Sequence, residues 1–592
     1  MKVSLIKMLG LLYGSLPKER HRQFKALVVL IFISSFAEVI SLGAVLPFMA
    51  VITQPDEVLE YSIVALFAER FGINSGKELI IHLSLTFGLA AILSGVLRLL
   101  LLRASIHLGN NCGADLSVEV YRRTLYQPYN VHISQSTSEI IASITQKVGA
   151  VTSVLTSVVI LIASLFLFLS IVGTLIAVDP IIAISAAIVF GLAYVTISLA
   201  TKKKLKENSL VIAQEQNFVV KALQEGLGSI RDVLIAGTQE LYISLYDESV
   251  NKIRHSTSQN TFINQFPRYA IEALGLVSIA TFVLYLNNNG GNITNSLGLI
   301  AILALGAQRL LPITQQIYGN WSLVIGNQYA IADVLKLLNQ PLISQNNKHD
   351  EDKLIFDKSI KFQNVSFTYS KNDKLVFDNI SLSIPKGSRV GIVGTTGGGK
   401  STLLDLLMGL LDPSEGKIYV DGKDVSLRKF KRSWQSSIAH VPQNIFLTDA
   451  SIAENIAFGV PLDKIKMADV KKAAKYAKIS DFIESSPDGY SASVGERGVR
   501  LSGGQRQRIG IARALYREAD VIVFDEATSA LDDKTEDAVM HTINNLSQNI
   551  TMFIVAHRLT TLKKCDFIVK LDSGEVIGTY DYNQIIEMNE IS

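Results

Sequence analysis

Long apolar stretches dominate the first half of the chain, and shorter alternating patterns dominate the second half. Up to about residue 325, six stretches reach the roughly 20 residues that a helix needs to cross a bilayer. They lie near 26–52, 78–103, 151–177, 181–200, 265–287 and 294–315. From about Leu354 onward, β-rich runs alternate with helical patterns and no spanning stretch occurs. The pattern predicts an α-helical transmembrane domain of six spans followed by an α/β domain.

The connections between the apolar stretches alternate in charge. The first, third and fifth are short or acidic, whereas the second and fourth are long and basic. The basic residues are Arg122, Arg123 and Lys147 in the second connection, and Lys202, Lys203, Lys204 and Lys206 in the fourth. Because basic loops stay on the cytosolic side, the N-terminus, both long connections and the α/β domain are predicted to be cytosolic.

The predicted domain boundaries follow changes in composition. Residues 1–25 carry an interrupted apolar stretch followed by Lys18, Arg20 and Arg22, which favours an amphipathic helix on the cytosolic membrane face over a cleaved signal peptide. The transmembrane domain is therefore assigned to 1–338, a polar linker to 339–353 and the α/β domain to 354–592.

Two segments of the long cytosolic connections have helical apolar spacing. They are Leu223 to Gly237 and Ser136 to Val148. Such faces favour docking on another protein surface, and the alternative is an ordinary helical hairpin without a partner.

Overall composition narrows the functional class. Hydrophobic residues make up 48% of the chain, mean hydropathy is +0.30 and formal net charge is +3. These values are typical of a membrane protein, and the net charge is too small to indicate a nucleic-acid partner. The two cysteines, Cys112 and Cys565, are predicted to be reduced thiols in the cytosol.

A phosphate-binding loop begins the chemistry of the second domain. The stretch Gly394-Thr-Thr-Gly-Gly-Gly-Lys-Ser401 fits G-x-x-x-x-G-K-[ST] and lies between a predicted buried strand, 389–394, and a predicted helix, 401–411. Backbone N–H groups and the helix N-terminus would bind phosphate oxygens. Lys400 would contact the outer phosphates, and Ser401 would hold Mg²⁺.

Two adjacent carboxylates follow an apolar run at 521–524. Asp525 at the end of a buried parallel strand suits Mg²⁺ coordination, and Glu526 suits the role of general base for the attacking water. The alternative is a structural ion pair.

A second anion site is predicted at Leu501-Ser-Gly-Gly-Gln505, because a serine and two glycines precede an arginine-rich helix. One chain does not need both sites. Two chains arranged head to tail do, since each such loop would close on the γ-phosphate bound by Lys400 of the other chain.

The order of these motifs resembles that of the ATP-binding-cassette transporters. Leu501 to Gln505 is similar to their signature, Tyr369 to the aromatic that stacks on adenine, and Gln443 to the glutamine that senses Mg²⁺. Ser529 to Asp532 is similar to the loop that crosses between two sites, His557 to the switch histidine, and Val494 to Gly498 to an exporter loop that contacts the membrane helices. The resemblance implies ATP and Mg²⁺ as cofactors, ATP hydrolysis coupled to translocation, and a homodimer of half-transporters in a lipid bilayer.

The predicted site residues can be grouped by role. ATP binding is assigned to Tyr369, Gly394, Thr395, Thr396, Gly397, Gly398, Gly399, Lys400, Ser401, Thr402, Ser502, Gly503, Gly504, Gln505 and Asp532. Catalysis is assigned to Glu526, His557 and Gln443, and Mg²⁺ binding to Ser401, Gln443 and Asp525.

Four arginines lie toward the cytosolic half of the predicted spans: Arg98, Arg103, Arg268 and Arg309. Arg309 is about 22 Å from the outer start of its span at 1.5 Å rise per residue. Ionisable residues inside a membrane are functional candidates, and guanidinium binds phosphate in a bidentate way. These arginines therefore indicate an anionic substrate. The alternatives are snorkelling to the interface, pairing of Arg268 with Glu272, and neutralisation of one arginine by Glu38.

An outer loop helix at 56–71, the stretch Phe266 to Tyr269 with Glu272, and Arg309-Leu-Leu-Pro312 resemble the bacterial flippases for lipid-linked oligosaccharides of protein N-glycosylation. The resemblance implies a polyprenyl-pyrophosphate glycan as substrate and the cytoplasmic (inner) membrane as location. A multidrug or lipid A-type exporter with the same ATPase remains the alternative, and a soluble cassette ATPase is disfavoured by the six spans.

Overall fold

The computed structural model describes residues 4–44, 48, 51–52, 75–178, 180–288, 293–342, 354–370, 374–526, 533–546, 549–556 and 558–590. The described chain divides into two compact units. The first contains Met1–Gln127 and Ser134–Ile343, and the second contains Pro128–Ile133 and Ser344–Ser592. Each is described separately below.

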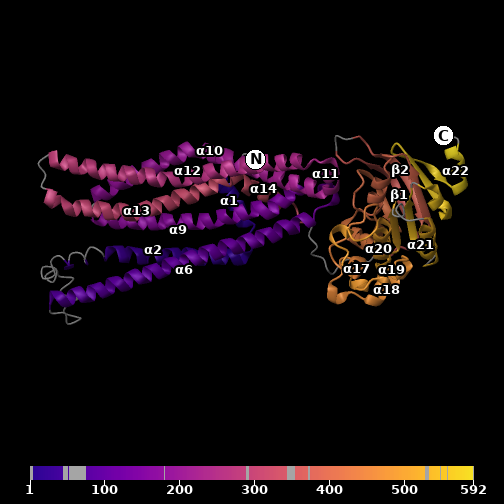
Figure 1. The fold of residues 1–592 in the computed structure, drawn as a ribbon, viewed down its shortest axis with the longest axis horizontal. Helices are drawn as coiled ribbons and strands as arrows, with labels where there is room; N and C mark the ends of the chain where they lie inside the picture. Colours follow the sequence, from indigo (N-terminus) through magenta and orange to yellow (C-terminus); the bar gives the residue numbers. More distant parts are fainter. Residues whose placement is uncertain are drawn as a thin grey trace. The chain divides into compact units, whose positions relative to one another are not determined.

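The first unit is entirely helical in its described residues (Figure 1). Its long helices are α2 (Lys18–Gly43), α6 (Gly76–Leu125), α9 (Val148–Val178), α10 (Pro180–Gly228), α12 (Gln239–Asn288) and α13 (Ile293–Gly326). Shorter helices are α1 (Leu5–Gly14), α8 (Thr137–Ala142), the π-helix η1 (Ser143–Lys147), α11 (Ile230–Ala236) and α14 (Gln328–Leu338), while α7 (Tyr129–Ser134) falls mainly in the second unit. The long helices run lengthwise, with α2 beside α6 and α10 beside α12.

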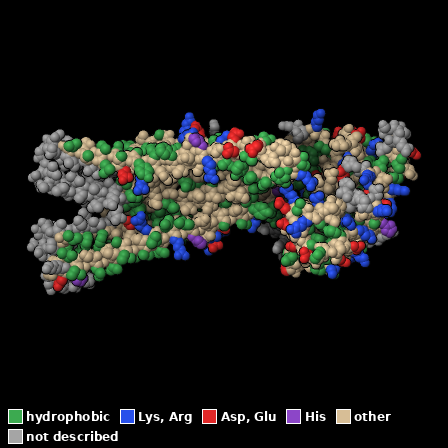
Figure 2. Space-filling model, viewed as in Figure 1, with side chains coloured by type: hydrophobic (Ala, Val, Ile, Leu, Met, Phe, Trp, Pro, Cys, Tyr) green, Lys and Arg blue, Asp and Glu red, His purple; other side chains and the backbone are tan. Residues whose placement is uncertain are grey.

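Three stretches of the described chain are long and apolar enough to cross a membrane: Lys18–Ser41, Glu78–Leu125 and Thr137–Thr174. Many large apolar side chains on these helices are exposed, for example Phe32, Leu85 and Leu99. Figure 2 shows hydrophobic side chains covering much of the helical unit's surface. Exposed apolar surface of this extent on long helices is expected where lipid covers it. The other three predicted spans begin or end in α10, α12 and α13, where some side chains are not described, so the count of six stays a prediction.

The N-terminal segment forms two helices, α1 and the first turns of α2, where the sequence predicted one amphipathic helix. Leu12 is fully buried and Met8 is 8% exposed, in a cluster with apolar residues of α6, α9 and α14. Arg20 on α2 donates to Asp115 on α6 at 2.7 Å. The apolar face of α1 therefore packs on protein, while Ile6 and Leu11 remain exposed on its other side.

The segment from Ser136 to Val148 also differs from its prediction as a docking surface. It forms α8 and the π-helix η1, and it packs within the helical unit. Lys147 is 0% exposed, and its Nζ lies 2.5 Å from Oδ2 of Asp333 on α14. The other predicted docking segment does expose apolar side chains: Leu234 and Ile235 on α11 are 61% and 79% exposed.

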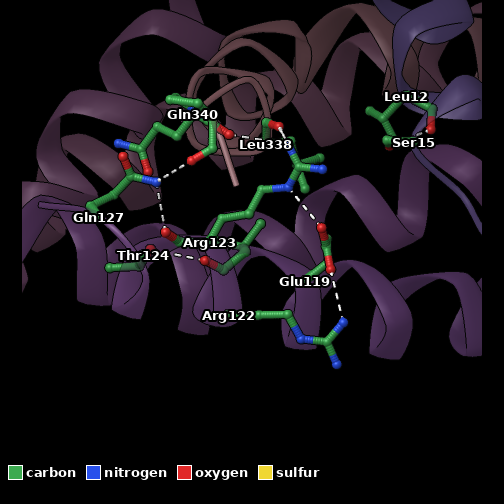
Figure 3. Close-up of polar contacts among 11 residues, drawn as sticks. Leu12, Ser15, Glu119, Arg122, Arg123, Thr124, Gln127, Leu338 and Gln340 are labelled. Carbon is green, nitrogen blue, oxygen red and sulfur yellow. Dashed lines mark hydrogen bonds and ion pairs between the residues drawn. The ribbon is translucent and has the colours of Figure 1, made fainter. Parts of the chain in front are cut away.

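The C-terminal end of α14 is held by Arg123 of α6 and by Gln127, two residues after α6 (Figure 3). Arg123 donates to the carbonyl oxygens of Leu338 and Gln340, and its Nε donates to Glu119 Oε1 at 2.7 Å. Gln127 Nε2 donates to the carbonyl oxygen of Pro341 at 3.1 Å. A helix leaves its last carbonyls without intrahelical partners, and here Arg123 supplies a donor to that of Leu338, while Arg123 and Gln127 also hold the chain just after the helix.

The second unit contains two sheets. The strands are β1 (Ser359–Phe367), β2 (Phe377–Pro385), β3 (Arg389–Gly394), β4 (Glu415–Val420), β5 (Lys423–Asp424), β6 (Ile438–Val441), β7 (Val521–Asp525), β8 (Thr551–Val555), β9 (Phe567–Asp572) and β10 (Glu575–Tyr580). The order is β2-β1-β4-β5 in the first sheet and β10-β9-β3-β8-β7-β6 in the second. In the second sheet all described pairings are parallel except that of β10 with β9.

Helices accompany these sheets: α15 (Lys400–Leu407), α16 (Arg428–Ser436), α17 (Ile452–Ile456), α18 (Met467–Tyr476), α19 (Ser480–Ser485), α20 (Gly503–Tyr516), α21 (Asp533–Leu546) and α22 (Tyr582–Glu590). The 3-10 turns are η2 (Leu462–Lys464), η3 (Gly489–Ser491), η4 (Glu496–Gly498) and η5 (Leu559–Lys564). Strands β3, β7 and β8 are apolar on both faces, as parallel strands covered by helices must be. The predicted strand 389–394 is confirmed, whereas the predicted helix 401–411 ends at Leu407, followed by Gly409 at φ +64°.

Candidate functional site

The phosphate-binding loop connects β3 to α15. Gly399 is the N-cap residue of α15 and has φ +95°, a conformation that residues with a side chain rarely adopt. A Cβ at this position would lie 2.7 Å from ring atoms of Phe377. Both the backbone angle and the lack of space therefore require glycine here.

Lys400 lies across this loop. Its Nζ donates to the carbonyl oxygens of Gly394 at 2.8 Å and Thr395 at 3.1 Å. Ser401 follows at the exposed N-terminal end of α15. One ammonium group, a hydroxyl and the free N–H groups of a helix N-terminus form a donor set that fits a polyphosphate.

The sheet order brings two carboxylates to the same edge as this loop. Strand β8 lies between β3 and β7, and all three are parallel, so Asp525 at the end of β7 lies near the end of β3. The next residue, Glu526, has φ +51°, and its N–H donates to Val555 at 3.1 Å. Gln443 Nε2 donates to Glu526 Oε2 at 2.5 Å. The structure therefore brings Gln443 and Glu526 together at this edge, and their catalytic roles stay predictions.

Carboxylates gather around Lys400. Burial raises the pKa of Asp525, the charge of Glu526 raises it further, and Lys400 opposes the shift. Burial, aided by the charge of Asp525, raises the pKa of Asp405 to about 6. This excess of negative charge suits a divalent cation. No group of three His, Cys, Asp or Glu in the described ranges could hold a metal without other ligands, so the donor set fits Mg²⁺ bound together with phosphate oxygens.

Asp405 was missed by the sequence analysis. It lies on α15 among Leu403, Leu404, Leu406 and Leu407, all buried. The sequence did contain a signal for this residue: a single carboxylate in an otherwise apolar helical turn, directly after a phosphate loop.

Tyr369 is 48% exposed. Its hydroxyl lies 2.9 Å from Thr402 Oγ1 on α15, and its ring meets Phe367 edge-on with centroids 5.0 Å apart. The ring is thus fixed on two sides close to the phosphate loop, and its exposed part could stack on a flat base.

The predicted signature begins α20. Ser502 is its N-cap residue: its Oγ accepts from the N–H of Gln505 at 3.2 Å, and Gln505 Oε1 accepts from the N–H of Ser502 at 2.8 Å. This capping box fixes the loop in front of the exposed N-terminus of α20. Gly503 and Gly504, in the first turn, add no side chain there.

Two arginines of α20 have structural contacts in place of the anion contacts that an arginine-rich helix suggested. Arg508 donates to the carbonyl oxygen of Lys478 at 2.7 Å. Arg513 donates to the carbonyl oxygens of Phe446 at 3.1 Å and Asn455 at 2.9 Å, and burial lowers the pKa of Arg513 to about 10. Arg513 therefore connects the signature helix to the segment that carries Gln443.

The segment from Val494 to Gly498 forms a tight turn. Val494 is fully buried, and Gly495 and Gly498 have φ +73° and +70°. Arg497 has φ +53° between them. The turn leaves Glu496 and Arg497 exposed, so both side chains are accessible to another surface.

Several predicted residues lie outside the described residues. They are His557 and the segment from Ser529 to Asp532 of the nucleotide site, and the outer loop helix at 56–71. Their roles stay predictions.

Among the predicted substrate arginines, Arg98 has a partner. Its NH1 lies 3.5 Å from Oε1 of Glu38 on α2, and Ser94 donates to Oε2 of the same carboxylate at 2.5 Å. Glu38 is 5% exposed. The pairing that the sequence left open thus neutralises Arg98 and joins α2 to α6.

The remaining three predicted substrate arginines lie on three different helices. Arg103 on α6 and Arg268 on α12 are exposed, and within the described part of the chain Arg268 forms no ion pair with Glu272. Arg309 belongs to α13, and its side chain is not among those described. The structure therefore leaves Arg103 and Arg268 available to a ligand.

Comparison with known proteins agrees with this site. The ABC transporter transmembrane region matches residues 24–305, and the ABC transporter ATPase family matches residues 377–529. The chain belongs to the ABC transporters. Its second unit is thus an ABC transporter ATPase domain, which uses ATP with Mg²⁺, and its first unit is the corresponding membrane domain.

Individual ABC transporters are similar over much of the chain. The heterocyst differentiation ATP-binding protein HepA of Nostoc sp. is 32% identical over 417 residues, 69% of this chain and 66% of that protein. The ATP-dependent lipid A-core flippase of Escherichia coli (strain K12) is 31% identical over 397 residues, 65% of this chain and 66% of that protein. The chain thus matches just under two thirds of the length of these relatives. A bacterial Atm1-family ABC exporter solved with ATP bound has a TM-score of 0.77 at 22% identity, covering 96% of both chains, and shows the same fold.

Proposed function

We propose that this ABC transporter is an ATP-driven exporter that flips an anionic lipid-linked glycan of the polyprenyl-pyrophosphate class across the cytoplasmic membrane. The ATPase assignment rests on one observation above all: Gln443 and Glu526 are hydrogen-bonded at the sheet edge where Asp525 and Lys400 also lie. The transport assignment rests on the fusion of this ATPase domain to a membrane domain in one chain.

Two copies of the chain would form the working unit. Each chain offers one phosphate loop around Lys400 and one signature loop around Ser502. In a homodimer arranged head to tail, the N-terminus of α20 in one copy would add its N–H groups to phosphates bound by the other copy. ATP would then hold two cassettes together, and hydrolysis through Glu526 would release them.

The cargo proposal rests on positive charge in the membrane domain. Arg103 and Arg268 are exposed, and the sequence places Arg309 deep in its span. An arginine in the middle of a bilayer costs about 2.5–3.5 kcal/mol on insertion scales, so a counter-ion is expected. A pyrophosphate group would supply it in bidentate geometry. Because Glu38 already neutralises Arg98, we assign Arg98 a structural role.

A lipid A-type exporter is the second candidate. It is favoured by the 31% identity to a protein named as a lipid A-core flippase. That name describes cargo of a similar kind, a lipid carrying a polar group. A multidrug exporter would also share the ATPase, but it would not require exposed arginines near the inner membrane surface.

Reconstituted flipping tests the proposal. Purified protein in proteoliposomes should translocate a labelled polyprenyl-pyrophosphate oligosaccharide when ATP and Mg²⁺ are present, and Glu526→Gln should abolish the signal. A labelled lipid A precursor and a cationic drug serve as alternative cargoes. Preference for either alternative, with no flipping of the pyrophosphate lipid, would reject the proposed cargo and leave the ATPase assignment intact.

Arg309→Ala should reduce flipping of the pyrophosphate lipid at least tenfold while basal ATPase stays within about twofold, because one charge-assisted contact contributes about 1.5–3 kcal/mol. Arg309→Lys retains the charge but not the planar pair of donors, so it should recover only part of the rate. Arg98→Ala is the comparison for a structural arginine, and it should lower thermal stability. Normal flipping by Arg309→Ala would show that this arginine does not bind cargo.

A further inference from the structure

Pro267 lies inside α12, eight residues after Gln259 and immediately before Arg268. Proline has no N–H, so the carbonyl of Ile263, one turn earlier, loses its normal helical donor. The carbonyl of Asn264 follows in the same turn. Pro267 is buried, at the inner end of the predicted fifth span. In such surroundings a carbonyl without a donor is destabilising, so a replacement is expected.

Tyr318 of α13 supplies the replacement at Ile263. Its hydroxyl donates to the carbonyl oxygen of Ile263 at 3.1 Å. Thr201 Oγ1 of α10 lies 3.2 Å from the same hydroxyl. Tyr318 is 4% exposed, so water does not compete freely for this contact.

Gln315, one turn before Tyr318 on α13, contacts the adjacent carbonyl. Its Nε2 donates to the carbonyl oxygen of Asn264 at 2.9 Å, and its Oε1 accepts from the hydroxyl of Tyr194 on α10 at 3.3 Å. Three helices that carry the fourth, fifth and sixth predicted spans therefore meet at the turn of α12 before Pro267.

Packing holds the same three helices closely together. A Cβ on Gly319 would lie 2.7 Å from Asn264 Oδ1, so the Asn264 side chain of α12 occupies the space next to this glycine of α13. Tyr194, Ile271 and Tyr318 form a buried cluster, with the two tyrosine rings 5.7 Å apart. We call the contacts of Tyr318 and Gln315 with Ile263 and Asn264 the Pro267 joint.

We propose that Tyr318 and Gln315 are positioning residues, which hold the turn of α12 before Pro267 against α13 and thereby fix the placement of Arg268 for anionic cargo. Arg268 directly follows the proline, so its position depends on how this turn is held against α13. Arg309 lies on α13, six residues before Gln315. The joint therefore sets the register between the two helices that carry Arg268 and Arg309. The role in cargo binding rests on the proposed function, whereas the joint itself does not.

A thermal double-mutant cycle tests the joint without any cargo. Tyr318→Phe removes the donor to Ile263 and should lower the Tm of the full-length protein by about 2–4 °C. Pro267→Ala restores a backbone N–H at position 267, which can bond to Ile263. In the Pro267→Ala background, Tyr318→Phe should lower Tm by less than half of the decrease that it causes in the unmodified protein. Equal losses in both backgrounds would overturn the joint.

Cargo-stimulated ATPase tests the positioning role in the same variants. With the labelled pyrophosphate lipid, Tyr318→Phe and Gln315→Met should each raise the apparent KM for cargo at least threefold. The KM for ATP and the basal kcat should not change, because the cassette is untouched, and Pro267→Ala/Tyr318→Phe should recover part of the lost affinity. An unchanged KM for cargo would make the joint structural only. Absence of stimulation in the unmodified protein would reject the proposed cargo, with the thermal cycle still deciding the joint.

Discussion

Glu526→Gln should bind ATP normally and hydrolyse it at least a hundredfold more slowly, because general-base catalysis contributes about 10²–10⁴-fold. The substitution removes the proton acceptor but keeps the shape of the side chain. It also keeps an oxygen that can accept from Gln443 Nε2, so the geometry of the loop should persist. Phosphate release and binding of a fluorescent ATP analogue, measured on one preparation, separate the two effects.

A matched control is available in the same domain. Glu518 also has positive φ, +48° against +51° for Glu526, and it lies on the surface, 3.6 Å from Lys472. Glu518→Gln should keep full ATPase activity, which excludes a general effect of replacing a strained glutamate. Hydrolysis by Glu526→Gln above a tenth of the normal rate would remove Glu526 from the role of base.

The second large effect is expected in the membrane domain, at the buried ion pair between Lys147 and Asp333. Asp333→Ala leaves the ammonium group of Lys147 without its partner at a position that is 0% exposed. Breaking such a pair costs about 3–5 kcal/mol, on the order of 10 °C in Tm for a unit of this size. Because the Asp333 side chain is 31% exposed, water can enter the space left by Asp333→Ala and solvate Lys147. The loss of stability should therefore be about 3 kcal/mol. Thermal unfolding of the detergent-solubilised protein measures it.

Two further variants separate charge from packing. Lys336→Ala, on the same helix, removes an ion pair with Glu139 whose side chains are 57% and 40% exposed, and it should change Tm by about 1 °C or less. The double replacement Lys147→Met/Asp333→Leu removes both charges, and it should recover most of the stability that Asp333→Ala loses. If the double variant is as unstable as Asp333→Ala, the loss comes from packing and not from an unpaired charge.

The ATPase domain could be predicted from the sequence because its site residues lie in short consecutive stretches. A phosphate loop occupies consecutive residues, so Gly394 to Ser401 showed the strand, the turn and the start of the helix together. The apolar run ending at Asp525 placed the carboxylates at a sheet edge for the same reason. The contribution of Asp405 depends on burial between elements distant in sequence, and no local pattern measures that burial.

The membrane domain was less predictable from sequence. Apolar length indicated the spans, but it could not show which polar groups meet between them. Glu38 and Arg98 are 60 residues apart in the chain, and their pairing depends on how α2 packs on α6. The same holds for Lys147 and Asp333. An amphipathic pattern shows that a helix has an apolar face, but not whether lipid or protein covers it; in α1, protein covers Met8 and Leu12.

The packing of α14 limits where a chimaera of this chain and a related transporter can be joined. The apolar face of α14 fills a core with α1, and Arg123 and Gln127 hold the chain that follows it at Gln340 and Pro341. A chimaera joined before α14 would therefore combine a foreign helix with a pocket shaped by residues of the first and second spans. A junction after Leu342 and before Leu354 keeps the core around α14 intact, but it separates the second unit from Pro128–Ile133, so an exchanged cassette must be replaced together with that segment.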